Sequence, residues 1–194
     1  MSGSPLLSRT PRSWAERAAA SLPLFLSDHA ICEQQAAASA LSLVGLYPDD
    51  EELVERMTAL AAEEISHLRR VLAILHRRGW RMARRRPNGY VRALRARIDV
   101  SSEPELRTDR LLVTAIIEAR SCERFGRLLE AVEDSEVRDL LLDLGPAEAR
   151  HWRMFHELAA RGVETEAFAR RWRRWLEIEC DLAAERGLAP TVHG

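Results

Sequence analysis

Apolar residues recur along this chain at alternating spacings of three and four, which is the period of an amphipathic α-helix. No stretch shows the strict apolar–polar alternation of a half-buried β-strand. Turns rich in Gly, Pro, Asp and Ser separate the helical stretches. The predicted helices span Ser13–Ser21, Leu24–Val44, Asp49–Gly79, Ser101–Val132, Asp134–Gly162 and Glu164–Arg186, with a short helix at Tyr90–Ile98. We therefore expect an all-α fold.

Glutamate and histidine interrupt the apolar stripes of the four central helices. The segments Glu64-Ile-Ser-His67 and Glu148-Ala-Arg-His151 share one spacing, which puts a carboxylate and an imidazole on the same helix face. A single glutamate precedes each segment by about thirty residues, Glu33 in one case and Glu118 in the other. The order Glu, loop, Glu-x-x-His therefore occurs twice, on either side of a connection of about 25 residues.

Four carboxylates in one core would each cost several kcal/mol unless they are protonated, paired or bound to metal. Two divalent ions would neutralise them, and two neutral imidazoles would complete the coordination. One Glu-x-x-His by chance is unremarkable, but this combined set is typical of ferritin-like di-iron or di-manganese proteins. The predicted metal ligands are Glu33, Glu64, His67, Glu118, Glu148 and His151. Carboxylate-rich ligation suits iron or manganese, and the sequence leaves both open.

Two local details leave alternatives open. Glu123 lies five residues after Glu118 and hence on another helix face, so it is a less suitable ligand than Glu118 without being excluded. Pro146 lies inside the fourth central helix, two residues before Glu148. It should kink or break the helix and re-aim the ligand turn, or else be a tolerated irregularity.

The chain length of 194 residues suits one domain with one core, and 46% hydrophobic with 30% charged residues indicates a globular protein. We predict a single ferritin-like domain over residues 1–194. It consists of a four-helix bundle at about 24–162 with a long crossover connection, an additional C-terminal helix at about 164–186, and a loose tail over 187–194.

The chain carries no sign of a membrane partner or of secretion. It contains no apolar stretch of membrane-spanning length, and residues 1–12 lack an apolar signal core. Its cysteines, Cys32, Cys122 and Cys180, form neither a Cys-x-x-Cys pair nor an even set. A reducing cytoplasm is the expected location.

All 29 basic residues are arginine, which genomic base composition explains as readily as function does. Residues 69–98 nevertheless contain eleven arginines and no acidic residue, interleaved with Trp80 and Tyr90. Guanidinium groups and aromatic rings together suit a single-stranded RNA loop, and the alternative is a solvated face. The candidate RNA-binding residues are Arg77, Arg78, Arg81, Arg84, Arg85 and Arg86, and a second such cluster spans Arg170–Trp175.

The segments around the predicted ligands are more specific than the ligands themselves. Asp28–Glu33, Leu60–His67, Ile117–Phe125 and Glu148–His151 together resemble the bacterial tRNA hydroxylase family called MiaE. This resemblance implies a di-iron monooxygenase with O2 as co-substrate, acting on the isopentenyl group of 2-methylthio-N6-isopentenyladenosine in the tRNA anticodon stem-loop. It also implies Glu64 and Glu148 as bridging ligands. The sequence contains no flavin, nicotinamide or iron–sulfur motif, so electrons should come from an external reductase.

Two other functions remain open on the sequence. One is a rubrerythrin- or ferritin-like peroxidase or iron-oxidising protein, which the missing rubredoxin-type cysteine pairs and the arginine-rich connection disfavour. The other is a helical RNA-binding protein whose metal is structural.

Overall fold

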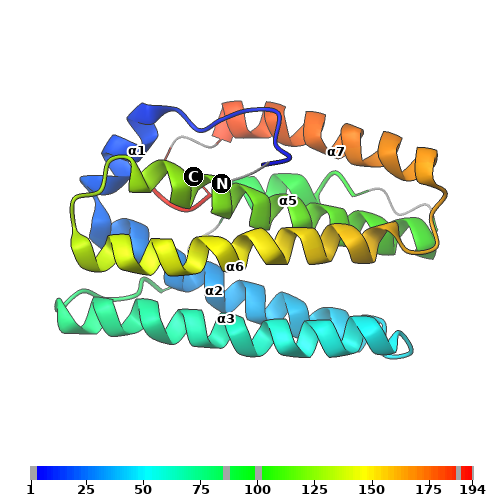
Figure 1. Ribbon diagram of the computed structural model, residues 1–194, viewed down its shortest axis with the longest axis horizontal. Helices are drawn as coiled ribbons and strands as arrows, with labels where there is room; N and C mark the ends of the chain where they lie inside the picture. The colour runs from blue at the N-terminus through cyan, green and yellow to red at the C-terminus, as the bar shows by residue number, and fades with distance from the viewer. Residues whose placement is uncertain (1–3, 85–87, 99–101, 187–188, 194) are drawn as a thin grey trace. The chain divides into compact units, whose positions relative to one another are not determined.

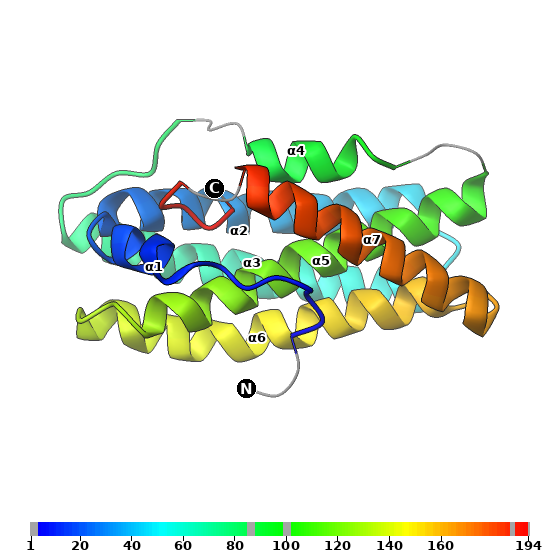
Figure 2. The same cartoon turned by 90° about the horizontal axis from the view of Figure 1, so that it is seen from above.

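The computed structural model describes residues 4–84, 88–98, 102–186 and 189–193. These residues form seven helices and no strand, which confirms the all-α prediction. The helices are α1 (Arg12–Ala19), α2 (Leu22–Leu46), α3 (Glu51–Arg77), α4 (Gly89–Arg95), α5 (Glu103–Leu129), α6 (Ser135–Ala160) and α7 (Thr165–Arg186). Figure 1 labels all of them except α4, which is labelled in Figure 2. They belong to two compact units, a hairpin unit (Ala20–Pro87) and a five-helix unit (Met1–Ala19 with Asn88–Gly194).

The hairpin unit consists of α2 and α3, which run side by side (Figure 1). Asp50 caps α3 by accepting a hydrogen bond from the backbone N–H of Leu53 at 3.1 Å, as the acidic turn in the sequence predicts. The helix ends before Gly79, whose positive φ of 69° is readily adopted only by a residue without a side chain. Pro23 lies in the first turn of α2, where its missing N–H leaves no helical hydrogen bond unmade.

The five-helix unit is built on a second hairpin, α5 and α6. Ser102 caps α5 through the backbone N–H of Glu105 at 3.4 Å, and Asp134 caps α6 through that of Val137 at 3.1 Å. Helix α6 continues through Pro146, so the expectation of a broken helix is wrong. Proline removes one backbone hydrogen bond there, while buried apolar residues before and after it hold the helix in place.

Helices α4 and α7 pack against each other and against α5, as Figure 2 shows. A fully buried polar cluster joins the three helices. Arg120 of α5 donates from Nε and Nη2 to Oε1 of Glu179 on α7, at 2.9 and 2.7 Å. The hydroxyl of Tyr90 on α4 donates to the same oxygen at 2.8 Å. These charge-assisted hydrogen bonds compensate the free-energy cost of burying the Arg120 and Glu179 charges.

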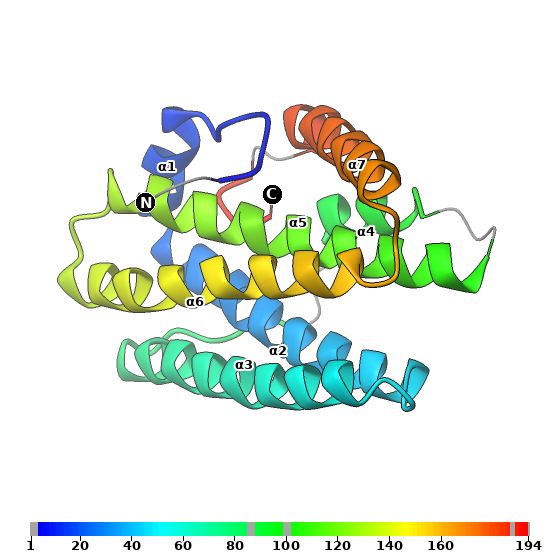
Figure 3. The same ribbon diagram turned by 45° about the vertical axis from the view of Figure 1, so that its right-hand side comes forward.

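The C-terminal tail over residues 189–193 packs against the five-helix unit, and the expectation of a loose tail is wrong for these residues (Figure 3). Trp14 donates from Nε1 to the carbonyl of Ala189 at 2.8 Å, and Arg124 donates from Nη1 to that of Val192 at 2.7 Å. The ring of His193 stacks on Tyr90 with centroids 5.6 Å apart. These contacts join positions far apart in sequence, which helical periodicity cannot reveal.

No helix in the described part of the chain is both long and apolar enough to cross a bilayer.

Candidate metal centre

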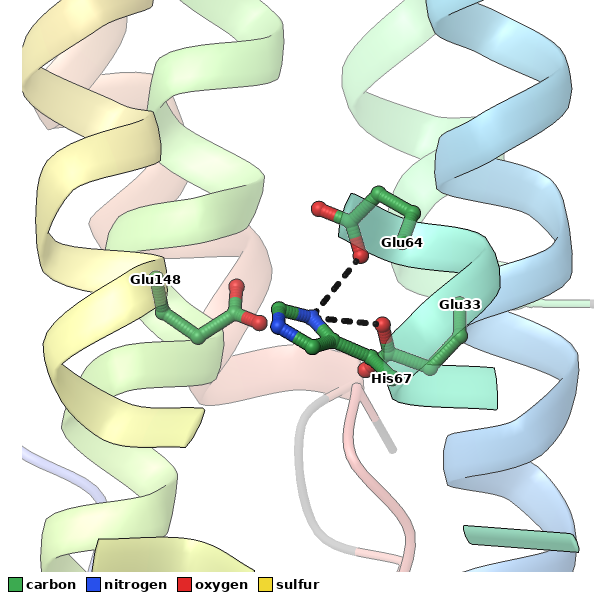
Figure 4. A group of neighbouring side chains, drawn as sticks. All are labelled: Glu33, Glu64, His67 and Glu148. Carbon is green, nitrogen blue, oxygen red and sulfur yellow. Dashed lines mark ion pairs between the residues drawn. The ribbon is translucent and has the colours of Figure 1, made fainter. Parts of the chain in front are cut away.

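The hairpin unit brings together three of the predicted ligands, Glu33 from α2 with Glu64 and His67 from α3. All three side chains are buried, and one potential ligand atom from each lies within 4.8 Å of the others. The Nδ1 atom of His67 is 3.4 Å from Oε2 of Glu33 and 3.4 Å from Oε2 of Glu64. Figure 4 shows the imidazole of His67 directed at these two carboxylates. One helical turn between Glu64 and His67 gives them the same face, as the spacing predicts.

Buried charges in this triad alter each other's proton affinity. Burial by itself would lower the pKa of His67, but hydrogen bonds and charge attraction from Glu33 and Glu64 raise it to about 9. Burial by itself would raise the pKa of Glu33, but the nearby His29 and His67 lower it well below its usual range. Without metal, the triad is therefore held by a protonated imidazole between carboxylates.

Two residues that we did not assign to the site contact the hairpin triad. His29 lies one turn before Glu33 on α2, and its Nε2 is 2.6 Å from Oε1 of Glu33. Glu63 lies one turn before His67 on α3, and its Oε1 is 3.8 Å from Nε2 of the imidazole. The four-residue spacing of each from a triad member could have identified both residues in the sequence. His29 is fully buried and contacts Glu33 from behind, the position of a residue that orients a metal ligand.

The five-helix unit brings together the other three predicted ligands, Glu118 from α5 with Glu148 and His151 from α6. They are 3–6% exposed. One oxygen of each carboxylate and a ring nitrogen of His151 lie within 4.8 Å of one another. The two units therefore each contain a buried triad of two carboxylates and one imidazole, as the repeated sequence pattern predicts.

Glu123 belongs to a different cluster from Glu118. Its carboxylate accepts hydrogen bonds from the backbone N–H of Thr10 at 2.9 Å, from the Thr10 hydroxyl at 2.5 Å and from Nη1 of Arg120 at 3.0 Å. These donors already occupy both oxygens and hold the N-terminal segment against α5. The five-residue offset from Glu118 thus directs Glu123 to another face of the helix.

The donor set of the two triads fits divalent iron or manganese, which prefer oxygen and imidazole ligands. Thiolates, which dominate structural zinc sites, do not take part. Cys122 lies one turn after Glu118, and its thiol donates to the carbonyl of Gly145 at 3.5 Å. Burial raises the pKa of Cys122, which keeps the thiol protonated and a weak ligand.

The arginine-rich segment after α3 belongs to the hairpin unit. Arg77, Arg81 and Arg84 are exposed, whereas Arg78 is half-buried and stacks on Trp80 at 5.2 Å. The backbone N–H of Ala83 donates to the hydroxyl of Ser27 at 2.8 Å, which holds the segment against α2. The remaining two predicted RNA-binding residues, Arg85 and Arg86, lie outside the described residues.

The second arginine cluster is divided between two roles. Arg171 donates from Nε to Oδ1 of Asp109 at 2.6 Å, and the buried Trp175 donates from Nε1 to the same oxygen at 2.7 Å. These two residues therefore join α7 to α5. Arg173 and Arg174 are exposed and have no partner among the described residues.

Helices that carry two triads of buried carboxylate and imidazole side chains define the class of this protein as an all-α, ferritin-like protein. A solved structure described as protein 43 with aldehyde deformylating oxygenase activity, from Synechococcus, matches it with a TM-score of 0.91. That match is 32% identical in sequence and covers 97% of this chain and 95% of the other. An oxygenase of this fold, together with the donor set, suggests iron as the metal.

Sequence comparison identifies the family to which this chain belongs. The model of the family described as tRNA-(MS[2]IO[6]A)-hydroxylase (MiaE) matches residues 3–194, so the chain belongs to this family. Two curated relatives are both named tRNA 2-(methylsulfanyl)-N(6)-isopentenyladenosine(37) hydroxylase. The one from Pseudomonas putida is 39% identical over 77% of this chain and 72% of its own length. The one from Salmonella typhimurium is 29% identical over 89% of this chain and 81% of its own length.

Proposed function

We propose that this protein hydroxylates the isopentenyl group of 2-methylthio-N6-isopentenyladenosine in tRNA. The observation that carries the proposal is the pair of buried triads, each with two glutamates and one histidine, in a chain of the MiaE family. A protein that only bound RNA would gain nothing from six buried ionisable groups, because each costs free energy unless it is compensated.

The two triads are proposed to hold one iron ion each. Glu33, Glu64 and His67 would be ligands of one ion, and Glu118, Glu148 and His151 would be ligands of the other. Four carboxylates balance the charge of two divalent ions, so the loaded site is close to neutral. Bound iron supplies the activation of O2 that hydroxylation of an unreactive C–H bond requires. His29, 2.6 Å from Glu33, orients that carboxylate and keeps one of its oxygens away from other donors.

The reaction must balance in oxygen and electrons. One atom of O2 enters the C–H bond of an isopentenyl methyl group to give an alcohol, and the other leaves as water. Two electrons and two protons are needed in each turnover. An external reductase supplies the electrons, because the sequence carries no motif for an organic or iron–sulfur electron carrier.

The RNA partner is proposed to be the anticodon stem-loop, and the site of action the cytoplasm. Exposed Arg77, Arg81 and Arg84 offer guanidinium groups for phosphate, and Trp80 with Arg78 offers a stacked pair for an unpaired base. Arg85 and Arg86 continue the same run in the sequence. An unpaired loop suits this combination better than a duplex does.

The test is a single-turnover reaction of the iron-loaded, chemically reduced protein with a stem-loop RNA that carries the modified adenosine. Under 18O2, mass spectrometry should show one 18O atom in the nucleoside, and RNA with unmodified adenosine should stay unchanged. Glu64→Ala should lose iron and product together. Product with oxygen from water would contradict the proposal.

The same preparation separates the other functions. A peroxidase or iron-oxidising protein would consume peroxide or oxidise iron at the same rate with and without RNA. A structural metal would give RNA binding without O2 uptake. Replacing the RNA by an aldehyde tests the activity named for the Synechococcus protein, and we expect no RNA-independent turnover of it.

A further inference from the structure

An aromatic cluster in the five-helix unit is used neither by the metal ligands nor by the arginine-rich segment after α3. Trp152 and His156 lie one turn apart on α6, and Phe168 and Trp172 lie one turn apart on α7. The centroid of the His156 ring is 6.4 Å from that of Trp152, 5.0 Å from that of Phe168 and 4.9 Å from that of Trp172. Each pair meets edge to face, the arrangement that aromatic rings prefer.

The cluster is not part of the apolar core. Phe168 is buried and forms its base, whereas Trp152, His156 and Trp172 are half-buried and keep part of their rings at the surface. Burial lowers the pKa of His156, so the imidazole is neutral at pH 7. We call Trp152, His156 and Trp172 the aromatic platform. Tryptophan and arginine are enriched among the residues that contribute most of the binding energy of an interface.

Positive charge borders the aromatic platform. The guanidinium of Arg153 lies over the ring of Trp152 at 4.8 Å. Arg173 and Arg174 follow Trp172 in the sequence, are exposed, and have no ion-pair or hydrogen-bond partner among the described residues. On a helix, Arg173 lies about 100° around from Trp172, on the flank of the platform, whereas Arg174 lies about 200° around and points away. An exposed guanidinium on that flank is complementary to the phosphate of a nucleotide whose base lies on the rings.

The aromatic platform is held on a rigid support. Arg171 and Trp175, on either side of Trp172 in the sequence, both donate to the buried Asp109 of α5. On α6, Trp152 directly follows His151, a member of the buried triad. The platform therefore lies at the same height along α6 as the triad, with a rise of about 1.5 Å between the two residues.

We propose that the aromatic platform binds unpaired bases of the RNA by stacking, while Arg173 contacts a phosphate beside them. This inference rests on the proposed function, because it takes the stem-loop RNA as the partner. It adds a second RNA contact region, in the five-helix unit. Bases of any kind have a flat face, so this contact supplies affinity and position with little sequence preference.

The test compares RNA affinities of variants by fluorescence anisotropy, using metal-free protein and an unmodified stem-loop. Trp172→Leu keeps an apolar side chain against His156 but removes the stacking face. We expect roughly 5- to 150-fold weaker binding of the stem-loop, the range for loss of one stacked base. Affinity for a duplex without a loop should not change. Trp172→Phe keeps a ring and should retain most of the affinity.

Salt dependence separates stacking from charge. Arg173→Gln should reduce the slope of log affinity against log salt by about 0.7, the value for one lost phosphate contact. The slope in Trp172→Leu should equal that of the unchanged protein. Leu142→Ala, at an exposed apolar position elsewhere on α6, is the matched control and should leave affinity and slope unchanged.

Three results would overturn the inference. They are equal stem-loop affinity in Trp172→Leu, an equal loss of duplex and stem-loop binding, and a Phe variant as weak as the Leu variant. A Trp172→Leu protein that loses self-association while keeping its RNA affinity would instead assign the platform to a protein contact. Because binding is measured without iron or modified base, failure of the hydroxylation assay leaves this result unaffected, and the reverse also holds.

Discussion

The metal-free protein should lose stability as the pH rises from neutrality, because His67 is held in its protonated form between buried carboxylates. The contacts are those of Nδ1 with Glu33 and Glu64, both at 3.4 Å. They raise the pKa of His67 from 6.5 to about 9. A pKa that is higher in the folded state contributes stability that is fully present below pH 6.5. That stability is lost as the pH rises through about 9.

The size of this effect follows from the change in proton affinity. At roughly 1.4 kcal/mol for each tenfold change, the full contribution is at most about 3 kcal/mol. About 2 kcal/mol of it should disappear between pH 7 and pH 9. For a chain of this length, that corresponds to a fall of about 4–8 °C in Tm.

The measurement is urea unfolding of chelator-treated protein across this pH range, monitored by helical circular dichroism. His67→Gln keeps a side-chain donor for the carboxylates but cannot titrate, so its stability should lack this decline. His76→Gln, at an exposed histidine of the same helix, is the control and should behave as the unchanged protein does. Metal must displace the proton from His67, so titration calorimetry at pH 7.5 should show about one proton released from the hairpin triad.

A flat or rising free energy of unfolding between pH 7 and pH 9 in the unchanged protein would refute this reasoning. An equal decline in His67→Gln would refute it as well, because the titrating group would then lie elsewhere.

Three further results are expected. Glu118→Ala should reduce the iron content per chain, whereas Glu123→Ala should keep the iron and lower Tm, because Glu123 anchors the N-terminal segment. If metal analysis found less iron in Glu123→Ala than in Glu118→Ala, the ligand of α5 would be Glu123 and not Glu118. His29→Phe should weaken iron binding by about 10- to 100-fold in a chelator competition, since Glu33 loses the group that orients it. Ending the chain at Ala189 should cost about 3 kcal/mol in urea unfolding, because Arg124 loses a buried acceptor and Val192 its burial. An unchanged midpoint would mean that the tail is not bound in solution.

Much of this molecule was predictable because it depends on local sequence. Helix periods and helix caps act within a few residues, so the polar runs 49–52, 101–104 and 134–135 indicated helix starts, and Asp50, Ser102 and Asp134 are the residues that cap. The ligand spacing is equally local. Glu64 with His67 share a helix face whatever the rest of the chain does, and a short loop returns α3 beside Glu33. Assembly of both triads into one site with two iron ions stays a prediction.

Other features depend on contacts between residues far apart in the chain. Pattern alone could not show that Glu123 accepts hydrogen bonds from Thr10, or that the tail is buried beside Tyr90. The sequence of the second arginine cluster does not distinguish its members. In the structure, Arg171 donates a hydrogen bond to Asp109, whereas Arg173 is exposed.

The sequence by itself therefore determined the helices and the chemistry available on each helix face. Tertiary structure decided which polar side chains form hydrogen bonds between helices of the five-helix unit and which stay exposed at its surface. The physical reason is that a buried charge must find its partner wherever packing brings one, and that partner can lie more than a hundred residues away.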